Sequence, residues 1–314
     1  MAIWCSDYKY NLASIMKNQH WKYSHPKFET DAINPGFRSS PWAGHRRFAY
    51  DLVANLRPEV TVELGTHYGV SLFAMAQSLK DHGMTCRLVG IDTWEGDEHA
   101  GFYNNEVFES FEEIRSNIYA TVNTEALRMS FEEAVDLFED GSINLLHIDG
   151  LHTYQATKQD FEMWLPKISD RGMILFHDVS EATGYGTSLF WREIRGTAPS
   201  ITFPHSFGLG VLFPSGVPLE CEEMIEVSSN LPELYEVRSR LDLAEIQVVD
   251  QAAMIDDRDA AISAMAAMID DRDAAISAMT AMIDDRDAAI SAMTAIIDDR
   301  DAAISAMTAI IDET

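Results

Sequence analysis

Residues 60–71 read VTVELGTHYGVS: the apolar run Val60–Leu64 leads into a turn with two glycines, Gly65 and Gly69, and a helical pattern follows. A strand that passes through a glycine turn into a helix is typical of a nucleotide-binding α/β unit, because glycine lets the backbone approach a ligand where a Cβ atom would clash. Any tight strand–helix turn also uses glycine, so the motifs further along the chain must distinguish the two interpretations.

Strand-like runs and amphipathic segments alternate from residue 58 to about residue 215. The seven runs are Val60–Leu64, Arg87–Ile91, Ala126–Met129, Ile143–Ile148, Met173–Phe176, Ile201–Phe203 and Gly208–Phe213. The helical stretches between the first five are Val70–Lys80, Glu106–Ala120, Phe131–Phe138 and Tyr154–Leu165. This alternation predicts an α/β fold with a Rossmann-like, doubly wound, mostly parallel sheet of seven strands. The last two runs lie close together and predict an antiparallel hairpin at one edge.

The pattern divides the chain into four regions. Residues 1–57 are an aromatic-rich N-terminal segment, expected to be helical from Trp42 to Asn55 and to act as a lid. Residues 58–215 are the nucleotide-binding domain, and residues 216–250 are a helical linker. Residues 251–314 are a tandem repeat, expected to form a helical coiled-coil tail.

The repeat unit AMIDDRDAAISAMA begins at Ala253 and returns with small changes every 14 residues. Ile recurs every seven residues from Ile255 to Ile311, and the position three residues after each Ile up to Ile304 alternates between Arg and Met, beginning with Arg258 and Met265. In heptad terms this is an a/d seam with a cation at every second d position. One apolar stripe on a long helix predicts a homo-oligomer, whereas a solvated single helix with Asp–Arg pairs is the alternative.

Composition and charge argue against several kinds of partner. The net charge is −28, and residues 251–314 carry −10 of it through thirteen Asp, one Glu and four Arg. A surface this acidic repels phosphate backbones, so we expect no nucleic-acid partner. Cys5, Cys86 and Cys221 are far apart, which predicts reduced thiols. The N-terminus lacks signal-peptide features and no apolar run approaches the ~20 residues of a membrane span, so we expect a cytoplasmic protein without a membrane partner.

A carboxylate follows the second strand, in the sequence LVGIDTW. Asp92 lies at the carboxyl end of that strand and suits the diol of a ribose, because one carboxylate can accept hydrogen bonds from both hydroxyls. Trp94 just beyond it is expected to cover an adenine face, and Ser130, after the third strand, to lie at an adenine edge. The alternative for Asp92 is a helix cap or a surface carboxylate.

Polar side chains follow the next two strands, in LLHIDGLHTY and ILFHDV. Asp149 and His152 follow one strand, and His177 and Asp178 follow the other. Because the carboxyl ends of neighbouring parallel strands meet at one edge of a sheet, we expect these four to converge. Two carboxylates with one or two imidazoles suit Mg²⁺ or Mn²⁺. The strand alternation directs His147 elsewhere, so we expect it to be a packed or capping residue.

The motifs ELGTHYGVS, GIDTWEGD, LLHIDGLHTYQATKQDF and MILFHD, in this order and spacing, resemble class I methyltransferases that depend on S-adenosylmethionine (SAM). The most similar branch is the metal-dependent one that contains the macrocin type of macrolide-sugar O-methyltransferases and the cephalosporin-hydroxylase-like proteins. The resemblance covers about residues 58–215. It implies an O-methyltransferase that uses SAM and a divalent cation, and whose acceptor is a hydroxyl of a sugar, a glycan or a glycosylated small molecule.

The resemblance also implies roles for individual residues. Those expected to contact SAM are Glu63, Gly65, Thr66, Gly69, Asp92, Trp94 and Ser130. The expected metal ligands are Asp149, His177 and Asp178, and the expected catalytic groups are His152, as general base, and Asp149. This chain carries His177 where several members of the branch carry an acid, which leaves the identity and coordination of the metal open.

Two other functions remain open from the sequence. One is a hydroxylase-like enzyme on the same fold, for which no redox cofactor site is visible. The other is a catalytically inactive oligomeric scaffold, which the intact motifs count against. The aromatic and basic residues of the N-terminal segment are expected either to present aromatic faces to a sugar or to be ordinary packing; they are Trp21, Tyr23, His25, Phe37, Trp42 and Arg46.

Overall fold

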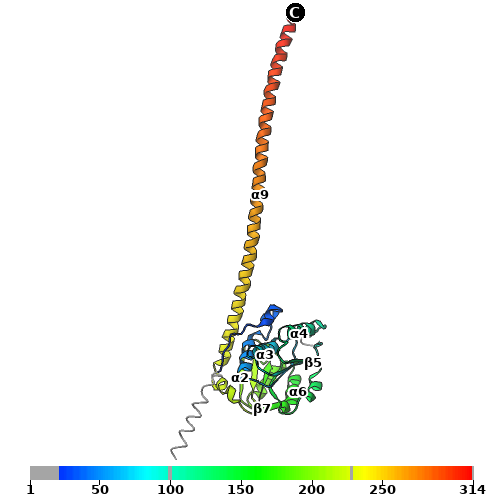
Figure 1. The fold of residues 1–314 in the computed structure, drawn as a ribbon, viewed down its shortest axis with the longest axis vertical. Helices are drawn as coiled ribbons and strands as arrows, with labels where there is room; N and C mark the ends of the chain where they lie inside the picture. Colours follow the sequence, from blue (N-terminus) through cyan, green and yellow to red (C-terminus); the bar gives the residue numbers. More distant parts are fainter. Residues whose placement is uncertain (1–20, 98–100, 227–228, 313–314) are drawn as a thin grey trace, which may run out of the picture. The chain divides into compact units, whose positions relative to one another are not determined.

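The computed structural model describes residues 21–97, 101–226 and 229–312 of the chain. It contains two units, Met1–Ala244 and Glu245–Thr314. The first is an α/β domain and the second is part of one long helix (Figure 1). Cys86 and Cys221 are buried free thiols, whereas Cys5 lies outside the described residues.

A seven-stranded sheet with the order β5-β2-β1-β6-β7-β9-β8 forms the centre of the domain. Its strands are β1 (Val60–Leu64), β2 (Arg87–Asp92), β5 (Thr124–Arg128), β6 (Ile143–Ile148), β7 (Ile168–His177), β8 (Ser200–Phe203) and β9 (Leu209–Leu212). The first five strands pair in parallel, and β9 is antiparallel to both β7 and β8. This confirms the predicted sheet and its edge hairpin. The strand order reverses between β1 and β6, where open α/β sheets form a crevice for ligands.

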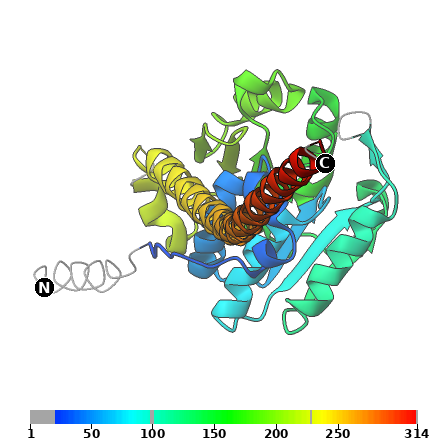
Figure 2. The ribbon, with the colours of Figure 1, turned by 90° about the horizontal axis from the view of Figure 1, so that it is seen from above.

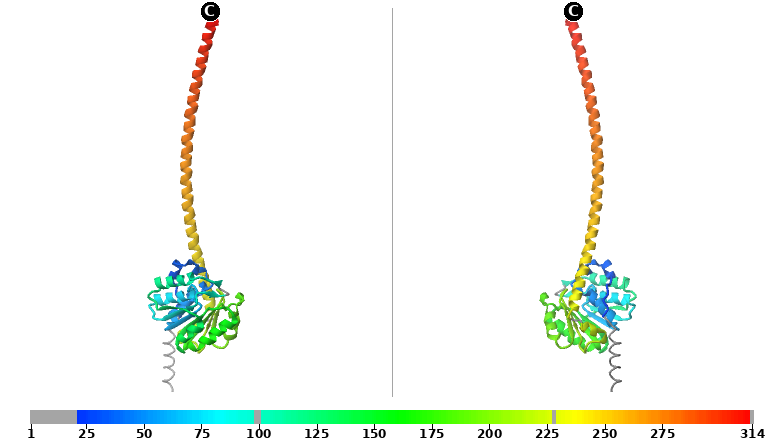
Figure 3. Two further views of the ribbon diagram at one scale, coloured as in Figure 1. Left: turned by 90° about the vertical axis from the view of Figure 1, so that its right-hand side faces the viewer. Right: turned by 90° about the vertical axis from the view of Figure 1, so that its left-hand side faces the viewer.

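Helices cover both faces of this sheet (Figures 2 and 3). The helices α2 (Arg46–Leu56), α3 (Val70–Asp81) and α4 (Glu106–Asn117) contribute to one hydrophobic core, and α5 (Phe131–Ala134), α6 (Tyr154–Trp164) and α7 (Gly186–Ile194) contribute to another. Adjacent residues of β6 show why two cores form: Leu145 belongs to the first and Leu146 to the second, because successive strand side chains point to opposite faces.

Two short elements were not predicted from the sequence. The strands β3 (Gly96–Asp97) and β4 (Gly101–Phe102) pair as a small antiparallel ribbon between β2 and α4. The helix expected from Trp42 is a 3₁₀ turn, Ala43–His45, followed by α2. No helix of the described part of the chain is long and apolar enough to cross a membrane.

The compact unit extends through the region expected to be a linker. After α8 (Glu222–Glu226), α9 begins at Leu231, and its first turns are packed against the domain. The fully buried carboxylate of Asp51 accepts hydrogen bonds from Tyr235 Oη (2.7 Å) and Arg238 Nη1 (2.8 Å). The Tyr235 hydroxyl in turn accepts from Trp21 Nε1 (3.0 Å). The N-terminal segment and the start of α9 therefore stabilise the same domain.

From there α9 (Leu231–Asp312) continues as one helix of 82 residues. Every side chain from Gln251 to Thr308 is exposed. The predicted helix is confirmed, and the coiled coil stays a prediction.

Candidate active site

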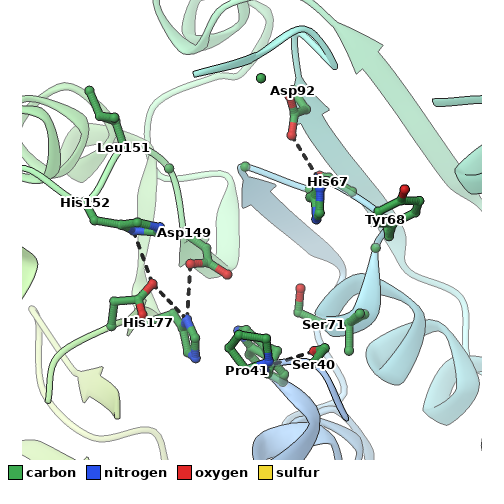
Figure 4. Close-up of a pocket in the computed structure, with 18 of the residues that line it drawn as sticks. Ser40, Pro41, His67, Tyr68, Ser71, Asp92, Asp149, Leu151, His152 and His177 are labelled. Atoms are coloured by element: carbon green, nitrogen blue, oxygen red, sulfur yellow. Dashed lines mark hydrogen bonds and ion pairs between the residues drawn. The ribbon is translucent and has the colours of Figure 1, made fainter. Parts of the chain in front are cut away.

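A cavity of about 770 Å³ opens at the carboxyl ends of β1, β2, β6 and β7 (Figure 4). Such a volume lies in the range of small-molecule and cofactor sites. The predicted site residues that line it are Gly65, Thr66, Gly69, Asp92, Ser130, Asp149, His152, His177 and Asp178. The structure thus brings nine predicted residues from five strand ends to one cavity. Glu63 and Trp94 do not line it.

The two glycines of the turn after β1 have positive φ angles, +87° at Gly65 and +82° at Gly69. A Cβ atom on Gly65 would lie 2.2 Å from the carbonyl oxygen of Asp149, and one on Gly69 would lie 2.7 Å from the ring of Phe73. Both glycines line the cavity, and they also make room for the neighbouring backbone and the core, which lets the turn lie against the strand end that carries Asp149. Their contact with a ligand stays a prediction.

Asp92 holds the turn in place and faces the cavity. One of its carboxylate oxygens accepts from the backbone N–H of His67 (2.8 Å) and the other from that of Trp94 (2.7 Å). Each oxygen retains a second lone pair, so the side chain can still accept from a ligand. Figure 4 shows Asp92 directed towards His67 at one end of the cavity, away from Asp149 and His177.

Trp94 has a structural role that differs from the expected one. Its side chain is fully buried and packs against Phe108 and Phe111 of α4. Its indole Nε1 donates to the carbonyl oxygen of His67 (2.8 Å). The expectation that Trp94 covers an adenine face is wrong in this structure, because the backbone turns at Trp94 (φ 54°) and the ring enters the core. Through its hydrogen bond to His67, Trp94 stabilises the glycine turn.

Glu63 does not line the cavity and is connected to it by hydrogen bonds through His147 and Trp42. It is fully buried, and its Oε2 accepts from Nδ1 of His147 (2.8 Å), its cross-strand partner. The Nε2 atom of His147 accepts from the indole Nε1 of Trp42 (3.3 Å), and Trp42 lines the cavity. Burial raises the pKa of Glu63, which the hydrogen bond to His147 opposes. The expected direct contact of Glu63 with SAM is corrected to this buried chain, and His147 is a packed residue, as expected.

Ser130 lines the cavity and begins α5. Its Oγ accepts from the backbone N–H of Glu133, and the Glu133 carboxylate accepts from the backbone N–H of Ser130 (3.0 Å). This capping box fixes the turn after β5. The hydroxyl of Ser130 is therefore already engaged by Glu133.

Four acidic and imidazole side chains converge at the other end of the cavity, as predicted. Nδ1 of His177 lies 3.3 Å from Oδ1 of Asp149 and 3.1 Å from Oδ2 of Asp178. Nδ1 of His152 lies 3.2 Å from the same Asp178 oxygen (Figure 4). Asp178 has φ 61°, a conformation that non-glycine residues rarely adopt and that clusters at functional sites.

The carboxylates around His177 raise its pKa. Burial lowers its pKa, but the charges and hydrogen bonds of Asp149 and Asp178 outweigh burial and raise it. Burial likewise raises the pKa of Asp149, and His177 outweighs this and lowers it. Nε2 of His177 donates to the carbonyl oxygen of Ser206 (3.1 Å), so Nδ1 is the atom that faces the carboxylates.

The cluster has the donor set of a divalent-cation site. Ligand atoms of Asp149, His152 and Asp178 lie within 4.8 Å of one another. Carboxylate oxygens with one imidazole nitrogen suit Mg²⁺ or Mn²⁺. The sequence assigned His177 to this group and His152 to proton transfer, whereas the geometry places both imidazoles beside Asp178, with His152 among the three mutually close residues.

The remaining wall is aromatic and was only partly predicted. Phe37 and Trp42 of the N-terminal segment line the cavity, together with Tyr185 and Phe207. Tyr185 stacks on the imidazole of His152, with ring centres 4.8 Å apart. Sequence reasoning missed Tyr185 and Phe207, because both lie in loops that no strand-end motif marks. Of the other N-terminal candidates, Trp21 is in the core and Arg46 is buried beside Asp31 (2.7 Å).

Residues 62–179 match a family model described as a methyltransferase domain. This part of the chain is therefore similar to a methyltransferase domain, and the strand-end motifs of β1, β2, β5, β6 and β7 lie in or beside the matched residues.

Two curated proteins share part of this sequence. An uncharacterized protein of Sinorhizobium fredii is 43% identical over 175 residues, which are 55% of this chain and 19% of that protein. An uncharacterized protein of Acanthamoeba polyphaga mimivirus is 31% identical over 126 residues, which are 38% of this chain and 51% of that protein. The chain thus spans about half of one relative and about a fifth of the other.

Two solved structures have a partly similar arrangement. A Podospora anserina methyltransferase with bound S-adenosylhomocysteine (SAH) has 14% identity and a TM-score of 0.46, covering 68% of this chain and 96% of that one. A Staphylococcus aureus protein described as a putative caffeoyl-CoA O-methyltransferase has 12% identity and a TM-score of 0.45, covering 65% and 97%.

Proposed function

We propose that this domain transfers the methyl group of SAM to a hydroxyl oxygen of a sugar, a glycan or a glycosylated small molecule, with a divalent cation bound beside the acceptor. One observation carries the proposal. The glycine turn with Asp92 and the cluster of Asp149, His152 and Asp178 lie at two ends of the same cavity. This cavity lies at the switch point of the sheet, and both of these groups of residues lie within the part of the chain that matches the methyltransferase model.

The end of the cavity around Asp92 suits the nucleoside part of SAM. Asp92 offers lone pairs to a ribose diol, and the turn from Gly65 to Gly69 leaves backbone rather than bulky side chains beside it. Ser130 lies on the neighbouring wall. SAM supplies a methyl group that its sulfonium already makes electrophilic, so the task of the protein is to align that group with the acceptor oxygen and exclude water.

At the other end, Asp149 and Asp178 would hold the cation, which supplies a Lewis acid that lowers the pKa of an acceptor hydroxyl. His152 is placed to take the proton. Its Nδ1 lies 3.2 Å from the carboxylate of Asp178 and its ring is stacked on Tyr185, and both contacts hold the imidazole at the acceptor end of the cavity. His177 neutralises part of the charge of the two carboxylates.

The aromatic wall supports a sugar as the acceptor. Phe37, Trp42, Tyr185 and Phe207 offer apolar ring faces, while the carboxylates at the same end accept hydrogen bonds from hydroxyl groups. A cation bound by two carboxylates also favours an acceptor with two vicinal oxygens, such as a sugar diol or a catechol.

The test is SAH formation from SAM with a panel of glycosides that carry vicinal hydroxyls, their deoxy analogues that lack one of the two hydroxyls, and catechol. We expect SAH only with intact diols, its loss on adding EDTA, and recovery with Mg²⁺ or Mn²⁺. Turnover that EDTA leaves unchanged would remove the cation from the proposal. A folded protein that does not bind SAM would overturn the proposal as a whole and favour the inactive scaffold.

A further inference from the structure

The repeat helix carries a continuous apolar stripe that nothing in its own unit covers. We define the seam as the a and d positions of the repeat from Ile255 to Met307, where Ile occupies every a position and Arg and Met alternate at d. Its apolar members are Ile255, Ile262, Met265, Ile269, Ile276, Met279, Ile283, Ile290, Met293, Ile297, Ile304 and Met307. The Ile side chains are 47–54% exposed and the Met side chains 56–62%. Exposed apolar surface of this extent marks an interaction site.

The period of the seam identifies the kind of partner. A straight α-helix drifts by ~20° per heptad relative to a seven-residue repeat, so the seam from Ile255 to Ile304 winds by about 140° around an unsupercoiled helix. A flat or globular surface would lose contact with such a stripe after a few turns. A second helix with the same repeat keeps contact throughout, because the two supercoil around each other. Another copy of this helix has the same repeat.

The distribution of charge also fits a second copy. The acids of each unit, such as Asp256, Asp257 and Asp259, lie outside the seam, and the cation Arg258 lies in it. Within one helix these cations pair weakly: Arg272 is 3.3 Å from Asp273 and both side chains are more than 60% exposed. In a parallel coiled coil a d residue packs beside the e residue of the facing helix. The e residue after each Arg is Asp.

This pairing depends on the register. Two copies aligned without an offset, or offset by whole 14-residue units, place each Arg beside a facing Asp. An offset of seven residues instead places Arg258 beside Ala266 or its equivalents, which carry no charge. Parallel alignment also confines the Arg residues to one of every four layers, whereas antiparallel alignment would put an Arg in two of every four.

We infer that residues 251–308 bind the same residues of a second copy of this chain as a parallel coiled coil, in a register that sets each seam Arg beside a facing Asp. The apolar layers drive the association and the Arg–Asp pairs select the register. Because the units carry net negative charge, association strengthens as salt screens their repulsion.

The first experiment measures the mass of the full chain by light scattering at low and high salt. Ile269→Asp with Ile283→Asp disrupts the seam, and Ala267→Asp with Ala281→Asp adds the same charge on the opposite side of the helix. We expect an oligomer for the unsubstituted chain and the Ala variant, and roughly 100-fold or more weaker association for the Ile variant. A monomeric unsubstituted chain at high salt, or equal effects of the two variants, would overturn the inference.

The second experiment tests the contribution of the cations. Arg272→Met with Arg286→Met makes two charged layers apolar and makes the chain more negative. The seam predicts tighter association, whereas association governed by net charge predicts weaker association. Weaker association of this variant would contradict the assignment of these residues to the seam.

The third experiment tests the orientation. Under mild oxidation Met265→Cys should form a disulfide between two chains, beyond any seen in the unsubstituted protein. In an antiparallel pair each a residue faces a d residue, so full overlap of the two repeats would instead link Met265→Cys of one chain to Ile304→Cys of the other when the two variants are mixed. Linkage only in the mixture would overturn the parallel register.

Discussion

The α/β domain and the repeat helix form their proposed binding surfaces in opposite ways: the fold assembles the first, and repetition of one sequence unit forms the second. In the domain, residues far apart in sequence, such as Asp92, Asp149 and Asp178, meet because strand ends meet, and each has its own partners. In the helix, one 14-residue unit is repeated and its side chains are exposed. Single substitutions should therefore have large, distinct effects in the domain and small, similar effects in the helix.

The largest expected effect is at the cluster. Asp149→Asn or Asp178→Asn removes a negatively charged ligand, and we expect turnover to fall to background because the cation is lost. SAH release measures this. Asp140→Asn, at an exposed carboxylate paired with Lys167, is the matched control and should retain activity. Asp271→Asn in the repeat helix should also be active, and equal losses in all four variants would remove the distinction between the two regions.

The next effect concerns proton transfer. His152→Ala should lower kcat by about 10²–10⁴-fold, the usual contribution of a general base, while the dissociation constant for SAM stays the same. His82→Ala, at the end of α3, is the control. If the variant instead loses Mn²⁺ binding, measured by electron paramagnetic resonance, His152 is a metal ligand rather than the base.

A smaller effect is expected on the stability of the domain. Gly65→Ala introduces a Cβ atom 2.2 Å from the Asp149 carbonyl at a φ of +87°, so the free energy of unfolding should fall by about 2–5 kcal/mol. In the repeat helix, Ala267→Gly costs only about 1 kcal/mol of local helix stability. Thermal unfolding of the domain measures the first effect, and the helical circular dichroism signal of the full chain measures the second. Unchanged stability of the Gly65 variant would contradict the packing of the turn against Asp149.

The sequence predicts well the bounds of several strands and the meeting of side chains that follow them. Val60–Leu64 and Ile143–Ile148 are strands with the predicted bounds, and the convergence of Asp149 with Asp178 follows from parallel neighbours. Strand β7 begins at Ile168 rather than Met173, since residues Ser169–Arg171 are polar and lack the apolar signal.

The sequence does not predict the direction in which individual side chains point. The ring of Trp94 enters the core because its backbone has a positive φ, which the sequence LVGIDTW does not reveal. The contact of Glu63 with His147 depends on the register between β1 and β6, and the register appears only when the sheet is assembled. Tyr185 and Phe207 reach the cavity from loops whose course is set by the rest of the fold.

The smallest expected effect is on the pH dependence of stability. Burial, with a contribution from Glu132, raises the pKa of Asp160 on α6 to about 7. Because the folded state binds this proton more tightly than the unfolded state, the free energy of unfolding falls as pH rises from about 4 to about 7. Asp160→Asn should remove this fall and raise stability at pH 8 by about 1–3 kcal/mol.

Urea unfolding at pH 5 and pH 8 measures the effect. The control Asp271→Asn, in the exposed helix, should change the stability of the domain by less than ~0.5 kcal/mol at either pH. An Asp160 variant that is destabilised at pH 8 would show that the ionised carboxylate is a stabilising group.

The central claim is that one cavity binds SAM at the glycine turn and a divalent cation at the carboxylate cluster. Calorimetric titration of SAM and of Mn²⁺ into the full chain and into Asp92→Ala and Asp149→Asn tests it directly. We predict that Asp92→Ala weakens SAM by about 1–3 kcal/mol and leaves Mn²⁺ binding unchanged, and that Asp149→Asn abolishes Mn²⁺ binding and leaves SAM bound. Unchanged SAM affinity in a folded Asp92 variant, or Mn²⁺ binding that survives Asp149→Asn, would contradict it.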